Sequence, residues 1–281
     1  MKADKYLYLA LLTLALLGCS RYGNDLQYVK YGQIGVHITD APFPHDMISE
    51  ASVSIEKIEA RQKGSEGTGN DVVVLFKGQQ DINLLDLTNG LTHYMGEVEV
   101  PAGAYDLIRI FIGKASIQLV DGKTYELKTP SAAQSGVKAF IKPEIEVVED
   151  LATDVLLDFD ISKSFVLLGN VDTPEGIEGF NFKPVVRVSN LTEAGSLSGQ
   201  VQTITGITPV EMEGVQIGVM VSDTLHTTTF TDTNGAYMVL GLHAGTYRVL
   251  AEKTGFLTSS RDRVTITPGE VTEQDFELLP E

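Results

Sequence analysis

Residues 215–221 read VQIGVMV, with Val or Ile at positions 215, 217, 219 and 221. Alternation of apolar residues with a period of two is typical of a β-strand that turns one face to a core. The same period returns in four later pairs: Tyr237 and Val239, Tyr247 and Val249, Val264 and Ile266, Phe276 and Leu278. Short strands at regular intervals, with turn residues between them, indicate an antiparallel sandwich. We place this domain at residues 196–281, after a polar linker at 190–195 (NLTEAG).

The preceding segment, residues 33–189, also has the pattern of strands. Ile34, Val36 and Ile38 alternate with smaller or polar residues. Denser apolar runs predict central strands covered on both faces at 72–76, 107–112 and 155–159. Short helices are expected only at 84–95 and 160–168. The predicted fold class is therefore all-β, with two tandem antiparallel β-sandwich domains after a lipoprotein signal peptide.

The N-terminus has the composition of a removable signal peptide. Lys2 and Lys5 precede an apolar run at 6–17, which is too short to cross a bilayer as a permanent helix. The alternatives are an uncleaved anchor or a buried core helix with an incidental cysteine. Residues 16–19 (LLGC) resemble a bacterial lipobox, and this resemblance implies removal of residues 1–18 and lipidation of Cys19.

The residues that follow Cys19 fit this interpretation. Residues 19–32 show no clean period and are expected to form a lipidated tether to the folded part. Ser20 stands where an Asp would resemble an inner-membrane retention signal, so the expected location is the bacterial cell envelope, at the outer membrane. The expected partner is the membrane itself, reached through the lipid anchor on Cys19.

Composition narrows the classes of partner. The chain has 21 Lys and Arg against 38 Asp and Glu, a formal net charge of -17, and no run of basic residues that would reverse this locally. An acidic surface repels both phosphate backbones and anionic lipid headgroups, so we expect no nucleic-acid partner and no electrostatic attraction to an anionic membrane. Cys19 is the only cysteine, which excludes an internal disulfide framework. The hydrophobic content of 43% is enough to build two cores.

Two acidic motifs contain residue types that can bind a cation. Residues 232–235 (DTNG) lack the flanking ligands of an EF-hand, because Phe230 and Gly241 occupy those positions. A type I′ hairpin turn is the preferred interpretation, with an irregular cation site left open. Asp158 and Asp160 flank Phe159 and project from one strand face, where paired carboxylates could hold a metal or do acid-base work.

No metal cluster and no cofactor are expected. The acidic residues that come nearest to a divalent-cation set are Asp40, Asp86, Asp158 and Asp160. A solvated sheet face or loop capping is the preferred role for these carboxylates. The five histidines lack ligand spacing and are interpreted as surface or turn residues.

A local similarity links the two halves of the chain. Residues 101–105 read PAGAY, and residues 243–247 read HAGTY. Each leads into an apolar strand, so we expect a tight turn in which Gly supplies backbone freedom and Tyr packs against the end of a sandwich.

Longer motifs resemble two known families. Residues 199–201 (GQV), 231–237 (TDTNGAY), 241–247 (GLHAGTY) and 253–256 (KTGF) resemble the carboxypeptidase regulatory-like domain. That resemblance implies a transthyretin-like sandwich used as an accessory module, similar to carbohydrate-binding folds. Residues 38–42 (ITDAP), 82–87 (INLLDL), 101–105 (PAGAY) and 157–160 (LDFD) resemble the bacterial domain of unknown function 4382. That family occurs in lipoprotein precursors and implies no particular reaction.

The functional expectation is a non-enzymatic binding or structural module anchored in the envelope. The sequence has no nucleophile elbow, zinc motif, P-loop or dinucleotide fingerprint, so catalytic residues are expected to be none. The ligand is unknown. Two alternatives are a carbohydrate-binding surface protein and a fimbrial or adhesive subunit, and an envelope protein is a further possible partner. A hydrolase using Asp158 and Asp160 is the least favoured alternative.

Overall fold

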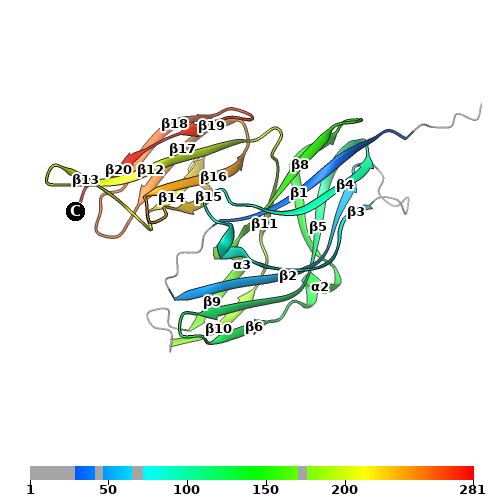
Figure 1. Ribbon diagram of the computed structural model, residues 1–281, viewed down its shortest axis with the longest axis horizontal. Coiled ribbons are helices and arrows are strands. Elements are labelled where there is room, and N and C mark those ends of the chain that lie inside the picture. Colours follow the sequence, from blue (N-terminus) through cyan, green and yellow to red (C-terminus); the bar gives the residue numbers. More distant parts are fainter. Residues whose placement is uncertain (1–28, 42–46, 65–71, 170–175) are drawn as a thin grey trace, which may run out of the picture. The chain divides into compact units, whose positions relative to one another are not determined.

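A computed structural model of the chain describes residues 29–41, 47–64, 72–169 and 176–281 (Figure 1). Cys19 and the predicted signal peptide lie outside the described residues. Residues 31–281 form one compact unit. The described part is composed mostly of strands, with only short helical turns, which confirms the all-β prediction. No described helix is long and apolar enough to cross a membrane.

The first sheet of the N-terminal sandwich has the strand order β11-β8-β1-β4. Its strands are β1 (Tyr31–Ala41), β4 (His93–Pro101), β8 (Ala152–Asp160) and β11 (Val186–Asn190). β1 is antiparallel to β4 but parallel to β8. This parallel pairing was not part of the expected antiparallel arrangement, because a period of two is the same in both kinds of ladder.

The second sheet has the strand order β3-β2-β5, and β5 also pairs with both β6 and β7. Its strands are β2 (Ile48–Gln62), β3 (Val72–Asn83), β5 (Gly103–Leu119), β6 (Thr124–Leu127) and β7 (Val137–Val147). A separate hairpin joins β9 (Phe165–Gly169) to β10 (Ile177–Phe182). The short helical turns are η1 (Leu84–Leu87), α2 (Pro130–Gln134) and α3 (Ile161–Ser164).

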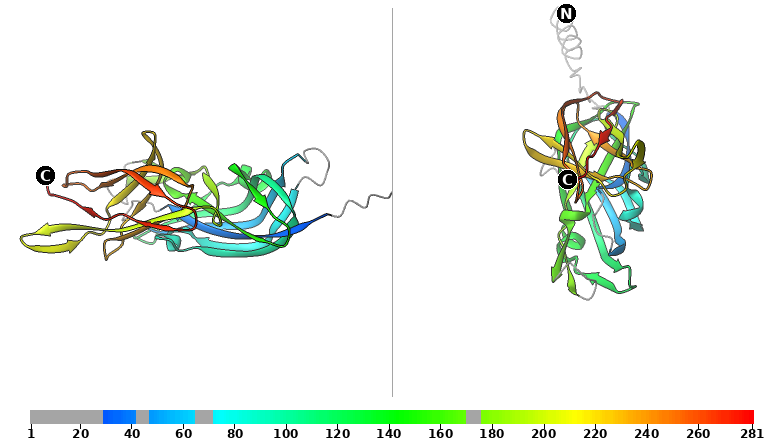
Figure 2. Two further views of the ribbon diagram at one scale, coloured as in Figure 1. Left: turned by 90° about the horizontal axis from the view of Figure 1, so that it is seen from above. Right: turned by 90° about the vertical axis from the view of Figure 1, so that its left-hand side faces the viewer.

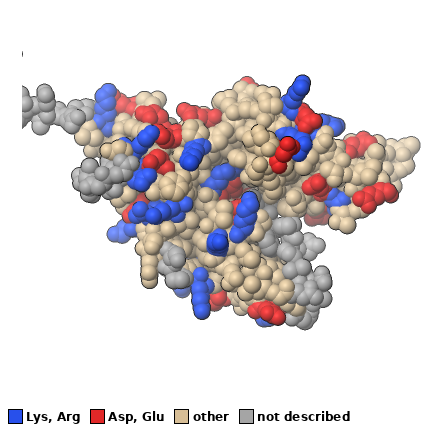
Figure 3. All heavy atoms as spheres, turned by 180° about the vertical axis from the view of Figure 1, so that it is seen from behind, with Lys and Arg blue, Asp and Glu red and all other residues tan. Residues whose placement is uncertain are grey.

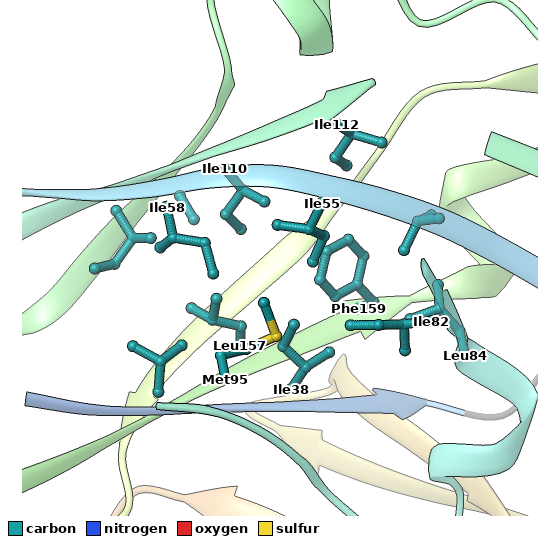
Figure 4. Packing of buried hydrophobic residues seen from close by; sticks show 14 of the residues in the cluster. Ile38, Ile55, Ile58, Ile82, Leu84, Met95, Ile110, Ile112, Leu157 and Phe159 are labelled. Atoms are coloured by element: carbon teal, nitrogen blue, oxygen red, sulfur yellow. The ribbon is translucent and has the colours of Figure 1, made fainter. Parts of the chain in front are cut away.

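The core of this sandwich lies between β2 and β5 on one side and β1, β4 and β8 on the other (Figure 4). Ile55, Ile58 and Ile110 are completely buried, and they pack toward Leu157 and Phe159, which are also completely buried. Each such side chain contributes roughly 1.5–3 kcal/mol relative to an exposed one. Burial of these β-branched and aromatic residues from both sheets is therefore what holds the two layers together.

The C-terminal sandwich pairs two further sheets around its own core. One is centred on β12 (Gly195–Thr205), which is antiparallel to β13 (Thr208–Glu211) and β16 (Ala236–Leu242) and parallel to β19 (Val271–Glu273) and β20 (Phe276–Glu277). The other has the order β15-β14-β17-β18. Its strands are β14 (Gln216–Val221), β15 (Thr224–Phe230), β17 (Gly245–Glu252) and β18 (Ser259–Ile266).

Residues 216–221 form β14, an inner strand of the second of these sheets. Val215, Ile217 and Val219 are completely buried in the C-terminal core, as the alternation predicts, but Val221 at the end of β14 is 41% exposed, so the prediction was wrong at that position. Figure 2 shows the β12–β13 hairpin extending past the neighbouring strands, and Ile207 at its tip is 98% exposed. The alternating apolar pattern therefore identifies the core strands, whereas an isolated apolar residue in a turn, such as Ile207, does not indicate burial.

Some local predictions were wrong. Val72 and Val74 are 37% and 43% exposed, so the run at 72–76 is not covered on both faces. The reason is that β3 lies at the edge of its sheet. The runs at 107–112 and 155–159 are central, as predicted, and nearly every residue in them is buried.

The DTNG segment forms a turn, but not the predicted type I′ turn. Gly235 has a φ of 72°, whereas Asn234 is not among the residues with positive φ, and type I′ requires both. The Asp232 carbonyl accepts from the Gly235 amide at 2.9 Å, and its Oδ1 accepts from the Asn234 and Ala236 amides at 2.8 and 2.9 Å. Asp232 therefore caps its own loop, as expected.

The two Tyr-containing turns have the same hydrogen bond. The Tyr105 hydroxyl donates to the Pro101 carbonyl at 2.8 Å, and the Tyr247 hydroxyl donates to the His243 carbonyl at 2.8 Å. Gly103 has a φ of 139°, which confirms the expected role of its glycine. Gly245 has no positive φ, so that part of the prediction was wrong for the second turn.

We expect Tyr105→Phe to lower the free energy of unfolding by about 0.5–1.5 kcal/mol, because the buried Pro101 carbonyl loses its donor. Urea denaturation followed by circular dichroism measures the change. Tyr94→Phe is the matched control, since the Tyr94 ring is 52% exposed and its hydroxyl makes no hydrogen bond to a described residue. Equal stability of the two variants would show that this turn does not depend on its hydroxyl.

Candidate functional site

Asp158 is held in an ion pair by Arg187. The register of β8 with β11 places the two residues directly opposite each other. Arg187 Nε and Nη2 lie 3.1 and 2.6 Å from the same carboxylate oxygen, Asp158 Oδ2. The Asp158 side chain is 9% exposed. The pair therefore neutralises a buried carboxylate, so the preferred prediction of a solvated or capping role was wrong for Asp158, and the alternative acid-base role has no free carboxylate here.

The same guanidinium reaches the C-terminal sandwich. Arg187 Nη1 lies 2.7 Å from Nε2 of His226, which is on β15. Burial, reinforced by the positive charge of Arg187, lowers the pKa of His226 to about 4. His226 is therefore neutral at pH 7, so Nε2 can accept the hydrogen bond. The prediction that the histidines are surface or turn residues was wrong for His226, a half-buried strand residue that bridges two sandwiches.

Asp160 has a local structural role at the end of β8. Its Oδ1 accepts from the Ser162 hydroxyl at 2.6 Å and from the Lys163 amide at 3.0 Å, and Lys163 Nζ lies 2.6 Å from Oδ2. Burial by itself would raise the pKa of Asp160, but the hydrogen bonds from Lys163 and Ser162 outweigh it and lower the pKa. Asp160 is therefore the N-cap of α3, which is the expected capping role.

Asp40 is buried, with 6% of its surface exposed, and no described group makes a hydrogen bond of good geometry to its carboxylate. Burial raises the pKa of Asp40 well above the ordinary value, the nearby charges of Asp158 and Asp160 raise it further, and the backbone amide of Ile161 offsets only part of this rise. In the parallel register, Asp40 lies opposite Phe159 and Thr39 lies opposite Asp158. Adjacent strand positions face opposite ways, so Asp40 and Asp158 do not share a face.

Asp86 is exposed and accepts a hydrogen bond from Asn83 Nδ2 at 3.0 Å. Across the described residues, no group of three or more His, Cys, Asp or Glu is arranged to hold a metal ion. The four acidic residues considered from the sequence therefore do not meet at one site.

Asn89 makes a second polar bridge between the sandwiches. Its Nδ2 donates to the Ala236 carbonyl at 3.3 Å, and its Oδ1 accepts from the Met238 amide at 3.3 Å. The Asn89 side chain thus makes hydrogen bonds to the backbone of β16 that a neighbouring strand would otherwise make. Gly90 follows with a φ of 80°, and a Cβ at this position would meet the side chain of Met238. A larger residue at position 90 would therefore strain the backbone and displace Met238 beside this bridge.

A groove of about 490 Å³ opens beside Asn89 and is the best candidate for a ligand site among the described residues. Its lining comes from the turn at Asn89 and from β12, β16 and the segment around β19: Asn89, Ser198, Gly199, Gln200, Asp232, Ala236, Tyr237, Met238, Glu273 and Asp275. Ser198 lies opposite Met238 on one side and Glu273 on the other. The groove therefore runs across the solvent face of this sheet.

Several polar groups of the groove are fixed by the fold, and others are available. Asp275 Oδ1 accepts from the Gln200 amide at 2.7 Å. The Gln200 side-chain amide and the Glu273 carboxylate make no hydrogen bond to a described residue, and both are exposed. Donors and acceptors on a groove floor of small residues can bind a polar ligand. From the sequence, Gln200 was noted only as part of the family motif at 199–201, and neither Glu273 nor Asp275 was singled out. A polar residue on the outward face of a strand has no local pattern that marks it as a ligand contact.

Two family models match this chain, one for each sandwich. Residues 31–184 match the model of the domain of unknown function DUF4382. The chain belongs to this family. Residues 196–279 match the carboxypeptidase regulatory-like domain. Both resemblances stated from the sequence are confirmed. No curated protein matches the chain significantly.

Solved structures give only distant likenesses. The minor pilin GBS52 of Streptococcus agalactiae is 12% identical, with 89% of this chain and 96% of that chain covered and a TM-score of 0.26. The Bacillus anthracis TIE protein is 11% identical, with 97% and 44% covered and a TM-score of 0.28. A cohesin–X-dockerin complex from Acetivibrio cellulolyticus is 21% identical over 31% of this chain, which spans 58% of that chain, with a TM-score of 0.25. Scores in this range do not establish a shared fold.

The His226 bridge predicts a loss of stability in mild acid. Because the folded-state pKa of about 4 lies below the ordinary value of 6.5, the stabilisation is complete above pH 6.5 and is lost as the pH falls toward 4. Protonation would place a cation against Arg187 and close to Lys163 and His243. We expect the free energy of unfolding to fall by on the order of 1 kcal/mol between pH 7 and pH 5, allowing for partial exposure.

Urea denaturation of wild type and His226→Gln at both pH values measures this loss. The variant should lose less stability than wild type over the interval, whereas His93→Gln, a histidine outside the bridge, should behave as wild type. The raised pKa of Asp40 acts in the opposite direction in all three proteins, so the comparison is between variants. An unchanged pH dependence in His226→Gln would contradict the assignment.

Proposed function

We propose that this chain is a non-enzymatic binding or structural module of the bacterial cell envelope, held at the outer membrane by a lipid on Cys19. The observation that carries the proposal is the pair of polar bridges between the sandwiches. Asn89 pairs with the backbone of β16, and Arg187 binds Asp158 and His226 together. Together with other contacts, such as Gly241 beside Ser189, these bridges join two separate cores into a unit suited to holding a surface at a fixed spacing.

The acidic residues support a module of this kind rather than a hydrolase. Asp158 is neutralised by Arg187, and Asp160 is used to cap α3. A general acid or base has to exchange a proton with a bound substrate. Both carboxylates instead have structural partners, so the hydrolase alternative loses the residues on which it was based.

The lipid anchor is tested by labelling. We expect cells expressing the wild-type chain to incorporate labelled palmitate into it and to retain it in the membrane fraction, because the lipobox-like residues 16–19 precede Cys19. Cys19→Ala should abolish both, and Ser20→Ala should change neither. Equal labelling of wild type and Cys19→Ala would disprove lipidation at this residue.

A second candidate function is carbohydrate binding in the groove beside Asn89. Its volume suits a short glycan, and Gln200 and Glu273 offer free polar groups. The ring of Tyr237 is only 2% exposed, so hydrogen bonds rather than aromatic stacking would hold a sugar. This distinguishes the site from glycan sites built on exposed aromatic platforms.

A glycan array followed by calorimetry on any hit tests this candidate. We expect Gln200→Ala combined with Glu273→Ala to weaken binding about tenfold or more, which corresponds to the loss of one or two hydrogen bonds. Glu252→Ala, at an exposed position on β17, is the matched control. Absence of any glycan hit, or a hit that the double variant binds as well as wild type, would exclude the groove.

A further inference from the structure

The outer face of the β3-β2-β5-β7 sheet brings together basic residues that are far apart in the sequence. Lys57 lies opposite Lys77, and Arg109 lies opposite Lys138 and also opposite Glu59. Directly opposed residues on antiparallel strands share a face, as do residues two apart on one strand. Arg61 joins the same face of β2. We call this set the basic face: Lys57, Arg61, Lys77, Arg109 and Lys138.

The carboxylates on this face do not balance its cations. Glu59 is shared by Lys57, at 2.8 Å, and Arg109, at 3.7 Å. Asp106 pairs with Arg61 through two hydrogen bonds of 2.8 and 2.9 Å. Lys77 and Lys138 are exposed and make no ion pair with a described residue. Like charges placed opposite one another destabilise a sheet, so an anionic partner would relieve this arrangement.

The other end of this sheet face is acidic, with Glu50, Asp81 and Glu126 around Lys114. The excess of positive charge is therefore confined to the end of the face around Arg109, where its sign is opposite to the net charge of -17 for the whole chain. Figure 3 shows Lys and Arg side chains among Asp and Glu side chains over one view of the molecule, so the acidic composition does not describe every part of the surface.

Exposed apolar side chains lie between these cations. Phe140 is 62% exposed, Val74 is 43% exposed and Val72 is 37% exposed. The register places Val74 opposite Glu59, Val72 opposite Arg61, and Phe140 opposite Leu107 on β5. Cations interleaved with apolar side chains match the boundary of a membrane, where phosphate groups meet acyl chains.

The length of chain before the first strand favours a membrane as the partner. Eleven residues lie between Cys19 and Tyr31, and this segment can span at most about 40 Å when fully extended. A lipid on Cys19 would hold Tyr31, the first residue of β1, within that distance of the bilayer. We propose that the basic face binds the phosphate headgroups of an anionic membrane. The choice of a membrane over other anionic partners rests on the proposed lipid anchor.

The test uses residues 19–281 with Cys19→Ser, so that lipidation plays no part. Co-sedimentation with phosphatidylglycerol vesicles and with phosphatidylcholine vesicles measures binding. We expect binding to the anionic vesicles only, with an affinity that falls as salt is raised. Lys77→Glu combined with Lys138→Glu should weaken this binding about tenfold or more. Both residues are exposed, so the double variant should fold as wild type does.

Lys183→Glu combined with Arg263→Glu is the matched control, because both residues are exposed and lie off the basic face. It should bind anionic vesicles as wild type does. The proposal is overturned if wild type does not distinguish the two kinds of vesicle, if both double variants weaken binding equally, or if only an acidic polysaccharide such as heparin is bound. Palmitate labelling of Cys19→Ala remains the separate test of the anchor, so either idea can fail without the other.

Discussion

The pairing of β2 with β5 is the constraint on which most of the N-terminal sandwich depends. These two long strands are opposed over nearly their full length, and their alignment, with its register shifts at Ile48/Glu50, Ser54/Ile55, Ile55/Lys57 and Arg61/Gln62, decides which side chains face the core. Ile55, Ile58, Ile110 and Ile112 are thereby directed into the core, where they are completely buried. A slip of one residue would exchange the two faces and expose the isoleucines while burying Lys57 and Arg109. The core and the basic face are thus two results of a single alignment.

The bridges between the two sandwiches are polar interactions, whereas the cores are held together by apolar packing. Asn89 satisfies a donor and an acceptor on the edge of β16, and Arg187 neutralises Asp158 while donating to His226. These contacts are polar and few, whereas each core is a large apolar cluster. Association through a few polar contacts is sensitive to pH and to single substitutions. Each sandwich can therefore keep its fold under conditions that weaken the connection between them.

The sequence pattern predicted the fold class but only part of the site. Alternation at 215–221 and at 34–38 identified core strands, because burial on one face has a local signature. The partners of those strands have no such signature. Arg187 is distant in sequence from both Asp158 and His226, and only the strand order brings the three together. For the same reason, a search for runs of Lys and Arg finds no basic cluster, although four strands assemble one.

The position of β1 has a mechanical consequence. β1 is an inner strand, hydrogen-bonded to β4 on one side and to parallel β8 on the other, and it is the first strand after the residues that would lead to an anchor. Ladder hydrogen bonds run across the strand direction. A pull along the chain from before Tyr31 would therefore load both ladders in shear, with many bonds sharing the force, instead of breaking them one at a time. An edge strand at this position would have only one ladder to resist detachment.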